Sequence, residues 1–478
     1  MSQTDPAKPE RRTFLKASGL AAAGLMTAAS AKKVLGANDR VRVAVVGLRG
    51  RGWDHVKGYK TISGVEIAYF CDVDENVLRK RCSDAEDLGL AKPQTFVDIR
   101  KLLEDKNVDA VSIATPNHWH SLIGIWAAQA GKDIYIEKPC SHNWWEGRQL
   151  VRAIDKYKVV CQHGSQCRSS AAIREAMEGM RSGLLGEVYM SRGLCYKWRG
   201  TIGHAPEQPV PEGVHYDLWT GPAPLKPFTK NRFHYNWHWI WDTGNGDLGN
   251  QGIHEVDLAR WGLGVTLPTK VTAVGGHFLF DDDQQTPNVL TVAYEFKSPG
   301  AKAKMMNFEV RGWITNHEAG IGTHEFASGG VPPAGLAKPP SVTPDKAPQP
   351  LGPPSNRPET IGNLYYGSKG YLAISGYEAY KSFLGENSDP GPAKHVPLNN
   401  EHFVNFIECV RSRKREDLHA PIVEGHLSAT LVHLANASYR LGRTINFNPD
   451  TETVVDDPEA VALLKGTYRA PYTVPESV

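Results

Sequence analysis

Apolar, strand-like runs alternate with helical stretches from residue 41 to about residue 164, and this alternation constrains the fold more than any other feature. Such runs, separated by helical segments, are typical of βαβ units with parallel, buried strands. One connection, Ser121–Ala130, is rich in small and apolar residues and stops at Gly131, as a crossover helix does. The strand-like runs are Val41–Val46, Val65–Phe70, Ala110–Ala114, Ile134–Ile136 and Val159–Gln162. We therefore predict an α/β protein with a doubly wound domain over residues 38–164.

The pattern changes from residue 165 onward. A helical segment at Ala171–Gly183 precedes runs whose apolar residues alternate as in an antiparallel sheet with one solvated or interface face. These runs are Glu187–Tyr196, Lys270–Phe280, Leu290–Phe296, Lys304–Ile314 and Tyr371–Ile374, and the helices that follow are Glu401–Arg413 and Ile422–Leu441. We predict a second, α+β domain over 165–448 with a large, mostly antiparallel open sheet. Within it, 329–358 is expected to form a Pro/Gly-rich surface loop, and 449–478 a C-terminal tail.

Length, charge and cysteine content limit the class of protein. At 478 residues the chain is too long for one core, which favours two domains. A net charge of +2 gives no sign of nucleic-acid binding. The seven cysteines contain no CxxC pair, so neither a disulfide framework nor a structural zinc site is expected.

The N-terminus is expected to be a targeting segment. Glu10-Arg11-Arg12 precedes a weakly apolar stretch that ends in Ala29-Ser30-Ala31. Paired arginines before such a stretch are the twin-arginine export signature, although Glu10 stands where Ser is usual. We predict a signal peptide over 1–31, recognition by the twin-arginine translocase, and export of the folded protein to the periplasm. The alternative is an uncleaved segment that anchors the protein to the membrane.

A glycine-rich turn directly follows the first predicted strand. Its residues are Gly47-Leu48-Arg49-Gly50-Arg51-Gly52. Glycines there allow close approach of the backbone to a pyrophosphate, so this is a candidate dinucleotide site in a Rossmann domain, although the spacing is GxxGxG and an empty turn is the alternative. Asp72 ends the second strand and can accept both ribose hydroxyls, which favours NAD over NADP. Arg79, Lys80 and Arg81 lie nearby in sequence and can soften that preference.

Two further strand ends carry polar motifs. The first is Thr115-Pro116-Asn117 with His120, and the second is Glu137-Lys138-Pro139. Because ligands bind at the carboxyl ends of parallel strands, Lys138 is placed to touch both a nucleotide and a substrate. Asn250 and His254 stand four residues apart, which predicts one shared helix face.

Taken in order, these motifs resemble the glucose–fructose oxidoreductase and inositol dehydrogenase family, called Gfo/Idh/MocA, from about Arg40 to Asn448. The resemblance implies that Lys138 contacts the reacting hydroxyl, that the Lys138–Pro139 peptide is cis, and that His254 is the acid/base residue. It implies cofactor contacts from the glycine turn, Asp72, the Thr115–Asn117 segment, His120 and Glu137. It also implies a homodimer or homotetramer.

Position 250 departs from the family pattern. Dehydrogenases of this family usually have aspartate four residues before the histidine, and this chain has Asn250. An amide can orient a hydroxyl, but it supplies no negative charge to make the histidine more basic. The catalytic residues predicted are therefore Lys138, His254 and Asn250, with an altered proton relay.

Other residues are candidates for binding substrate. They are Arg168, Tyr196, Lys197, Trp237 and His238, together with Asn250 and His254. The histidines His118, His120, His234 and His238 raise the alternative of a metal site, but no carboxylate spacing accompanies them and hydride transfer needs no metal. No metal is predicted.

Three functions stay open at this stage. The first is an exported oxidoreductase with tightly bound NAD that acts on a secondary hydroxyl or ketone of a sugar, glycoside or cyclitol. The second is NAD-dependent glycoside cleavage, in which transient oxidation at C3 allows elimination of the glycosidic bond. The third is a non-catalytic sugar-binding protein with the same fold.

Overall fold

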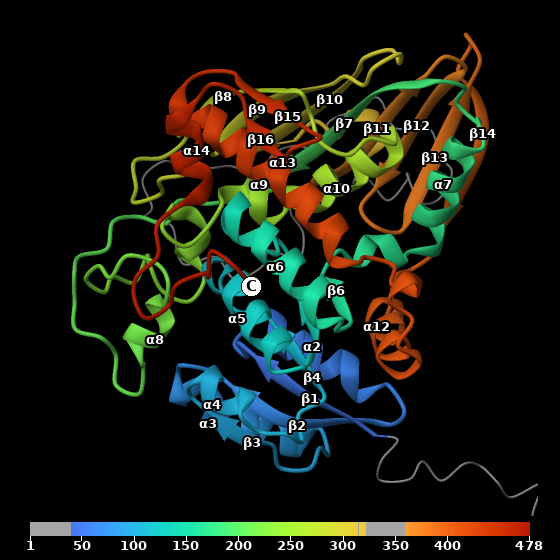
Figure 1. The fold of residues 1–478 in the computed structure, drawn as a ribbon. Helices are drawn as coiled ribbons and strands as arrows, with labels where there is room; N and C mark the ends of the chain where they lie inside the picture. The colour runs from blue at the N-terminus through green and yellow to red at the C-terminus, as the bar shows by residue number, and fades with distance from the viewer. Residues whose placement is uncertain (1–39, 314, 322–358) are drawn as a thin grey trace, which may run out of the picture. The chain divides into compact units, whose positions relative to one another are not determined.

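The computed structural model describes residues 40–313, 315–321 and 359–478 (Figure 1). The expected signal peptide at 1–31 lies outside these residues, and so does the Pro/Gly-rich segment 329–358. Among the described helices, none combines the length and the apolar character needed to cross a membrane.

The N-terminal part contains a parallel sheet of six strands in the order β3-β2-β1-β4-β5-β6. Its strands are β1 (Val41–Val46), β2 (Val65–Cys71), β3 (Gln94–Phe96), β4 (Ala110–Ile113), β5 (Asp133–Ile136) and β6 (Cys161–His163). This is the strand order of a Rossmann fold, in which the direction of winding reverses between β1 and β4. The predicted doubly wound sheet is therefore confirmed. The sequence analysis missed β3, which has three largely exposed residues and no apolar run.

Helices cover both faces of this sheet. They are α2 (Arg51–Lys60), α3 (Glu75–Asp87), α4 (Ile99–Leu103), α5 (Asn117–Gln129) and α6 (Trp144–Tyr157). Asp74 caps α3, since its side chain accepts a hydrogen bond from the backbone N–H of Asn76. The crossover helix α5 begins at Asn117, four residues earlier than expected from the sequence, directly after Pro116.

The second sheet has ten strands in the order β14-β13-β12-β11-β7-β10-β9-β8-β15-β16. They are β7 (Val188–Tyr196), β8 (Lys270–Gly276), β9 (Val289–Phe296), β10 (Lys304–Arg311), β11 (Thr360–Gly367), β12 (Gly370–Ser375), β13 (Ala379–Leu384), β14 (Asp389–His395), β15 (Ile445–Asn448) and β16 (Thr453–Val454). Only the β7–β10 pair is parallel, so the prediction of a mostly antiparallel sheet is confirmed.

Seven described helices follow in the C-terminal part. They are α7 (Ala171–Arg181), α8 (Tyr216–Thr220), α9 (Gly246–Asn250), α10 (Gly252–Leu263), α12 (Glu401–Ser412), α13 (Ile422–Leu441) and α14 (Pro458–Lys465), with short 3-10 helices η2 (Gln166–Ser169), η3 (Asn236–Trp239), η4 (Glu318–Gly320) and η5 (Arg415–Asp417). Four of the seven, α7, α10, α13 and α14, contact strands of this sheet. The tyrosine Tyr365 of β11 fixes α10 by donating a hydrogen bond to the backbone oxygen of Leu258. Strand β16 and helix α14 lie within 449–478, where the sequence analysis assigned only a tail.

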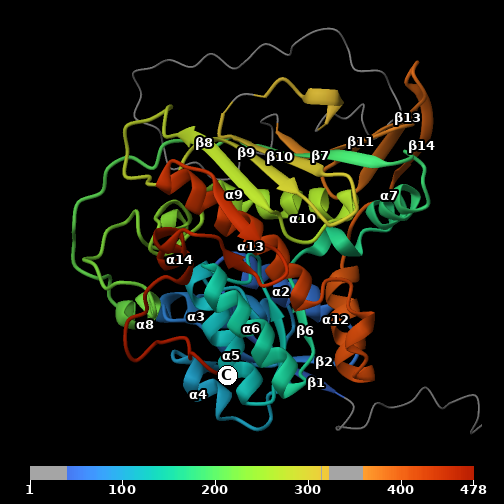
Figure 2. The same ribbon diagram turned by 45° about the horizontal axis from the view of Figure 1, so that its top comes forward.

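Helix α13 connects the two parts of the fold. It contacts α6 of the Rossmann domain and β8 and α10 of the C-terminal part. Figure 2 shows it running between these elements. Most residues of α13 are buried. Because α13 contacts α6 as well as α9 and α10, it holds the carboxyl ends of the parallel strands beside these two helices.

Candidate active site

A cleft of about 600 Å³ lies at the carboxyl ends of β1, β2, β4 and β5. The residues predicted from the sequence that line it are Gly47, Leu48, Arg49, Gly50, Arg51, Asp72, Thr115, Pro116, Asn117, His120, Glu137, Lys138, Trp237, His238 and Asn250. Segments far apart in the chain thus meet at one edge of the sheet, as the strand-end motifs predict.

Two glycines make the turn after β1 possible. Gly47 has φ +82°, and a Cβ there would lie 2.7 Å from the backbone oxygen of Ala114. A Cβ on Gly52 would lie 1.7 Å from the backbone oxygen of Gly47, so Gly52 packs behind the turn rather than lining the cleft. A Cβ on Gly50 would meet nothing within 4 Å, and α2 begins just after it with no side-chain cap. Unpaired N–H groups at a helix start suit an anion.

Asp72 both closes the turn and faces the cleft. Its carboxylate accepts hydrogen bonds from the backbone N–H of Leu48 at 2.8 Å and of Asp74 at 3.0 Å. Burial raises the pKa of Asp72 to about 6, against the effect of these two donors. Arg81, expected to influence the choice of NAD or NADP, donates instead to the backbone oxygen of Leu48 and pairs with Asp84.

Glu137 is engaged by α2. It accepts hydrogen bonds from Nε of Arg51 at 2.7 Å and interacts with Nε2 of His55 at 3.1 Å. Although burial opposes ionisation, the Arg51 guanidinium and His55 hold the pKa of Glu137 well below its usual value. The sequence analysis missed His55, which is fully buried and also contacts Ser112.

Lys138 reaches across to the C-terminal part. Its Nζ donates a hydrogen bond to the backbone oxygen of Asn250 at 2.7 Å and lies 3.4 Å from the amide oxygen of the same residue. The Lys138–Pro139 peptide is cis, as expected. Burial lowers the pKa of Lys138, and the negative charge of Glu137 opposes this effect.

His254 lies in the first turn of α10, four residues after Asn250 at the end of α9. Gln251 separates these two helices, so the single helix expected from the sequence is divided. Burial, reinforced by the Lys138 ammonium, lowers the pKa of His254 well below its usual value, which leaves a neutral imidazole. Its Nδ1 lies 4.0 Å from Sγ of Cys167, a neighbour that no sequence signal indicated.

Four predicted substrate ligands, Arg168, Tyr196, Lys197 and His254, lie outside the residues that line the cleft, and His254 itself is buried. Arg168 forms a buried, bidentate ion pair with Asp257 at 2.7 and 2.8 Å. Tyr196 is fully buried and donates to Glu309, while Lys197 interacts with Gln251 and Glu359. We therefore reassign Arg168 and Tyr196 to the internal packing of the domain, because their polar atoms are already paired there.

Asp247 and Arg199 are two further charged residues near the site that were not among the predicted site residues. Both side chains form an ion pair at 2.8 Å, and their charges act in opposite directions on the pKa of Lys138. Trp237 and His238 of η3 line the same cleft, as expected.

Two of the histidines considered as metal ligands, His120 in the cleft and His118 outside it, contact backbone oxygens. His120 contacts the oxygens of Pro139 and Thr115 at 2.6 and 2.7 Å, which connects two strand ends. His118 contacts the backbone oxygen of Trp219 at 3.0 Å. Within the described residues, no group of three or more His, Cys, Asp or Glu side chains is arranged to hold a metal ion.

Comparison with known proteins agrees with this geometry. The Gfo/Idh/MocA model for an oxidoreductase family with an NAD-binding Rossmann fold matches residues 41–165. The model for the family's C-terminal alpha/beta domain matches residues 172–293 and 367–474. A "Glycosyl hydrolase family 109 protein" of Shewanella pealeana is 30% identical over 203 residues, 38% of this chain and 44% of that protein. The chain thus spans less than half the length of the curated relatives it matches.

Solved structures share the fold. The WlbA dehydrogenase from Bordetella pertussis, in complex with NADH and UDP-GlcNAcA, has a TM-score of 0.58 at 20% identity, over 86% of this chain and 99% of that one. Aldose-aldose oxidoreductase from Caulobacter crescentus, complexed with glycerol, has a TM-score of 0.59 at 17% identity, over 85% and 100%. Together, the two family models account for most of the sequence, and the chain belongs to the Gfo/Idh/MocA family of oxidoreductases.

Proposed function

We propose that this protein is an NAD-dependent oxidoreductase that acts on a secondary hydroxyl or ketone of a sugar, glycoside or cyclitol. One observation carries the proposal: Lys138 lines the cofactor cleft and touches the end of α9, one turn before the buried, neutral His254. The dehydrogenase and oxidoreductase names of the structural neighbours support the substrate class.

The residues of the cleft fit NAD. The glycine turn leaves the start of α2 open to a pyrophosphate, and the Asp72 carboxylate faces the space where a ribose would bind. A carboxylate repels a 2′-phosphate, so NADP is the less favoured cofactor. Bound NAD would supply the acceptor for the hydride, and we infer that it is held tightly.

Lys138 and His254 then have separate roles. In the oxidative direction the alcohol loses its O–H proton and the hydride on the same carbon, and a carbonyl group forms. The neutral imidazole of His254 can accept the proton, while the Lys138 ammonium stabilises negative charge on the oxygen. Burial of both groups strengthens these interactions.

Asn250 favours a second candidate function, glycoside cleavage through transient oxidation at C3. Oxidation acidifies the neighbouring C–H, so the proton and the glycosidic leaving group can be lost by elimination. Water then adds to the double bond that forms, and the hydride returns to the carbonyl carbon of the sugar. The similarity to a glycosyl hydrolase family 109 protein supports this alternative, as does the missing carboxylate at position 250. It changes the outcome of the reaction but uses the same cofactor and the same lysine.

Nucleotide analysis of the purified protein followed by product analysis tests both functions. Absorbance and mass of the bound nucleotide should identify NAD or NADH. A keto-sugar product supports the oxidoreductase, and sugar release from a 4-nitrophenyl glycoside without net NADH supports glycoside cleavage. Protein that lacks nucleotide and fails to bind NADH would contradict both, and would favour the non-catalytic sugar-binding alternative.

We further propose export to the periplasm and assembly into a dimer or tetramer. The Arg11-Arg12 pair supports export by the twin-arginine translocase, with membrane anchoring as the alternative. Cell fractionation of the parent and of an Arg11→Lys/Arg12→Lys variant tests the location, because the paired lysines should retain the protein in the cytoplasm. Light scattering of the purified protein measures the assembly.

A further inference from the structure

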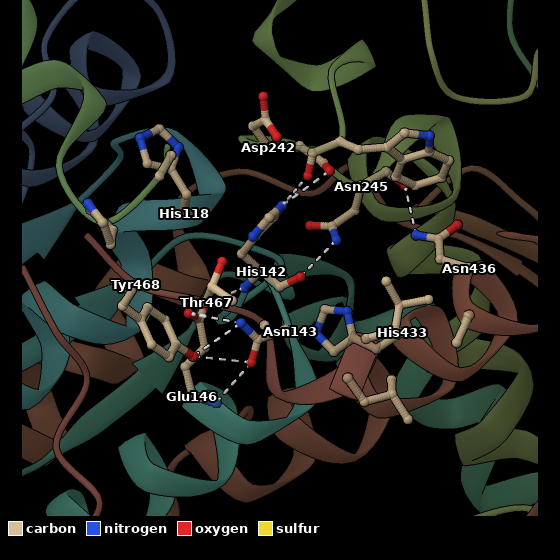
Figure 3. Close-up of a pocket in the computed structure, with 18 of the residues that line it drawn as sticks. His118, His142, Asn143, Glu146, Asp242, Asn245, His433, Asn436, Thr467 and Tyr468 are labelled. Carbon is tan, nitrogen blue, oxygen red and sulfur yellow. Dashed lines mark hydrogen bonds between the residues drawn. The ribbon is translucent and has the colours of Figure 1, made fainter. Parts of the chain in front are cut away.

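A second cavity, of about 280 Å³, lies apart from the cofactor cleft (Figure 3). It is bounded by the start of α5 and α6, by the loop before α9, and by α13 and α14. The two cavities have no lining residue in common. A hydrogen bond of 2.9 Å connects them, from Asn117, which lines the cleft, to Asn245, which lines the second cavity.

Polar side chains build one wall of this cavity. Asn143 receives a hydrogen bond from the backbone N–H of Glu146 and donates one to the hydroxyl of Tyr468 at 3.0 Å. The backbone N–H of His142 donates to the carboxyl group of Glu146. Figure 3 shows these four side chains grouped around the same space. The network fixes the wall before any ligand binds.

Most of these groups are uncharged near neutral pH. Burial lowers the pKa of His118 to about 3 and that of His142 to about 4. Burial also raises the pKa of Glu146 to about 8. The remaining charges in the lining, Arg440 and Asp242, are of opposite sign. A cavity without net charge does not select an anion or a cation.

Some hydrogen-bond acceptors among the lining residues have no donor in the described part of the chain. Nε2 of His118 contacts a backbone oxygen of Trp219 at 3.0 Å, so it carries the proton, and the buried Nδ1 is left as an acceptor without a partner in the described part of the chain. Nε2 of His142 likewise contacts the backbone oxygen of Trp241, which makes its Nδ1 an acceptor. The buried amide oxygen of Asn436 also lacks a partner among the described residues. Hydroxyl groups are the neutral donors that would satisfy such atoms.

We propose that this cavity binds a single neutral, hydroxyl-rich ring, a pyranose or a cyclitol, separately from the substrate beside Lys138. Its volume of about 280 Å³ is just below the roughly 300–1,000 Å³ usual for ligand pockets, which suits one ring and excludes a nucleotide. The apolar side chains of Ala223, Ala437 and Leu463 in the lining provide a surface for the C–H groups of the ring. This inference does not depend on the reaction catalysed in the cleft.

Binding measurements on the full chain, saturated with NADH, test the proposal. The probes are D-glucose and myo-inositol, titrated by calorimetry. Ala462→Trp adds a large side chain at an exposed position of the cavity lining, and Asn436→Leu removes the unpaired amide oxygen. Ala393→Trp makes the same change as the first variant on the exposed edge strand β14 and serves as the control.

We expect at least one probe to bind, and each cavity variant to weaken this binding at least tenfold, while Ala393→Trp leaves it unchanged. Thermal unfolding and NADH binding check that each variant is folded. The proposal is overturned if neither probe binds, or if folded Ala462→Trp binds both probes as tightly as the parent. Maltose, titrated in the same way, distinguishes a free ring from the end of a longer glycan. Maltose should compete with glucose only if the cavity accepts the terminal ring of a longer glycan.

Discussion

The carboxylate of Glu137 and the guanidinium of Arg51 are joined by a hydrogen bond of 2.7 Å. This contact links the end of β5 to the first turn of α2, so the residue next to Lys138 is fixed to the helix that follows the glycine turn. It also neutralises Arg51, which leaves the backbone N–H groups of α2 as the main anion-binding element of the turn. The cofactor turn and Lys138 are therefore aligned by one ion pair, whose Glu137 partner is buried and whose Arg51 partner is partly exposed.

Replacing Lys138 by methionine should reduce turnover by about 10²–10³-fold, because an electrostatic donor to the reacting oxygen is lost. NADH affinity should change little, since the glycine turn and Asp72 are untouched. Single-turnover formation of NADH measures the chemical step. Lys197→Met is the matched control, because Lys197 lies outside the residues lining the cleft. Equal loss in both variants would contradict the assignment of Lys138.

Replacing Asn250 by aspartate should shift the pH dependence of the reaction. A negative charge at position 250, whose side chain lies 3.4 Å from Nζ of Lys138, favours the protonated forms of nearby groups, so the low pKa of His254 should rise. Because the base must be neutral, the acid limb of the kcat/KM profile should move to higher pH. Asn245→Asp adds the same charge in the second cavity and should leave that limb in place.

Replacing Arg168 by alanine should lower the free energy of unfolding and leave the kinetic constants of the folded enzyme unchanged. Its side chain is 6% exposed and paired with fully buried Asp257, and removal of one partner of such a pair costs about 3–5 kcal/mol. Urea unfolding measures the loss. The exposed pair of Arg181 with Glu178 offers a control, since Arg181→Ala should cost about 0–1 kcal/mol. If Arg168 instead binds substrate, KM will rise while stability is kept.

Replacing Glu146 by glutamine should change how stability depends on pH. Burial raises the pKa of Glu146 to about 8, so the folded state holds a proton that the unfolded chain releases near its ordinary pKa. Stability contributed by this group is thus present at low pH and is lost as pH rises toward 8, with a limiting slope of about 1.4 kcal/mol per pH unit. Glutamine, which does not titrate, should flatten this slope between pH 5 and 8 in a urea unfolding series.

The sequence predicted the parts of the fold whose signal is local. Buried parallel strands leave apolar runs, and their polar ends follow directly, which is why the glycine turn and Lys138 were placed correctly in the cleft. Strand β14 was missed because its sequence, Asp389-Pro390-Gly391-Pro392, contains two prolines and belongs to a sheet edge. Strand β3 has only three residues, too few to show an alternation of apolar and polar side chains.

Residues whose roles depend on distant partners could not be predicted in the same way. Arg168 follows a parallel strand like a ligand, but Asp257 and Glu424, which pair with it, stand far along the chain. The contact of Cys167 with His254 likewise joins separate segments. Gln251 divides α9 from α10 within a sequence that reads as one continuous helix. Only the folded arrangement distinguishes these cases.

The lysine of the site is held by a main-chain atom at position 250, an oxygen that every amino acid carries. Substitution at this position therefore leaves the ammonium anchored while the side chain is free to vary. A change of side chain at position 250 can therefore alter proton transfer, whereas the position of Lys138 depends on the main chain and is kept. Related proteins that differ by one amino acid at this position would then catalyse different reactions with the same arrangement of the lysine.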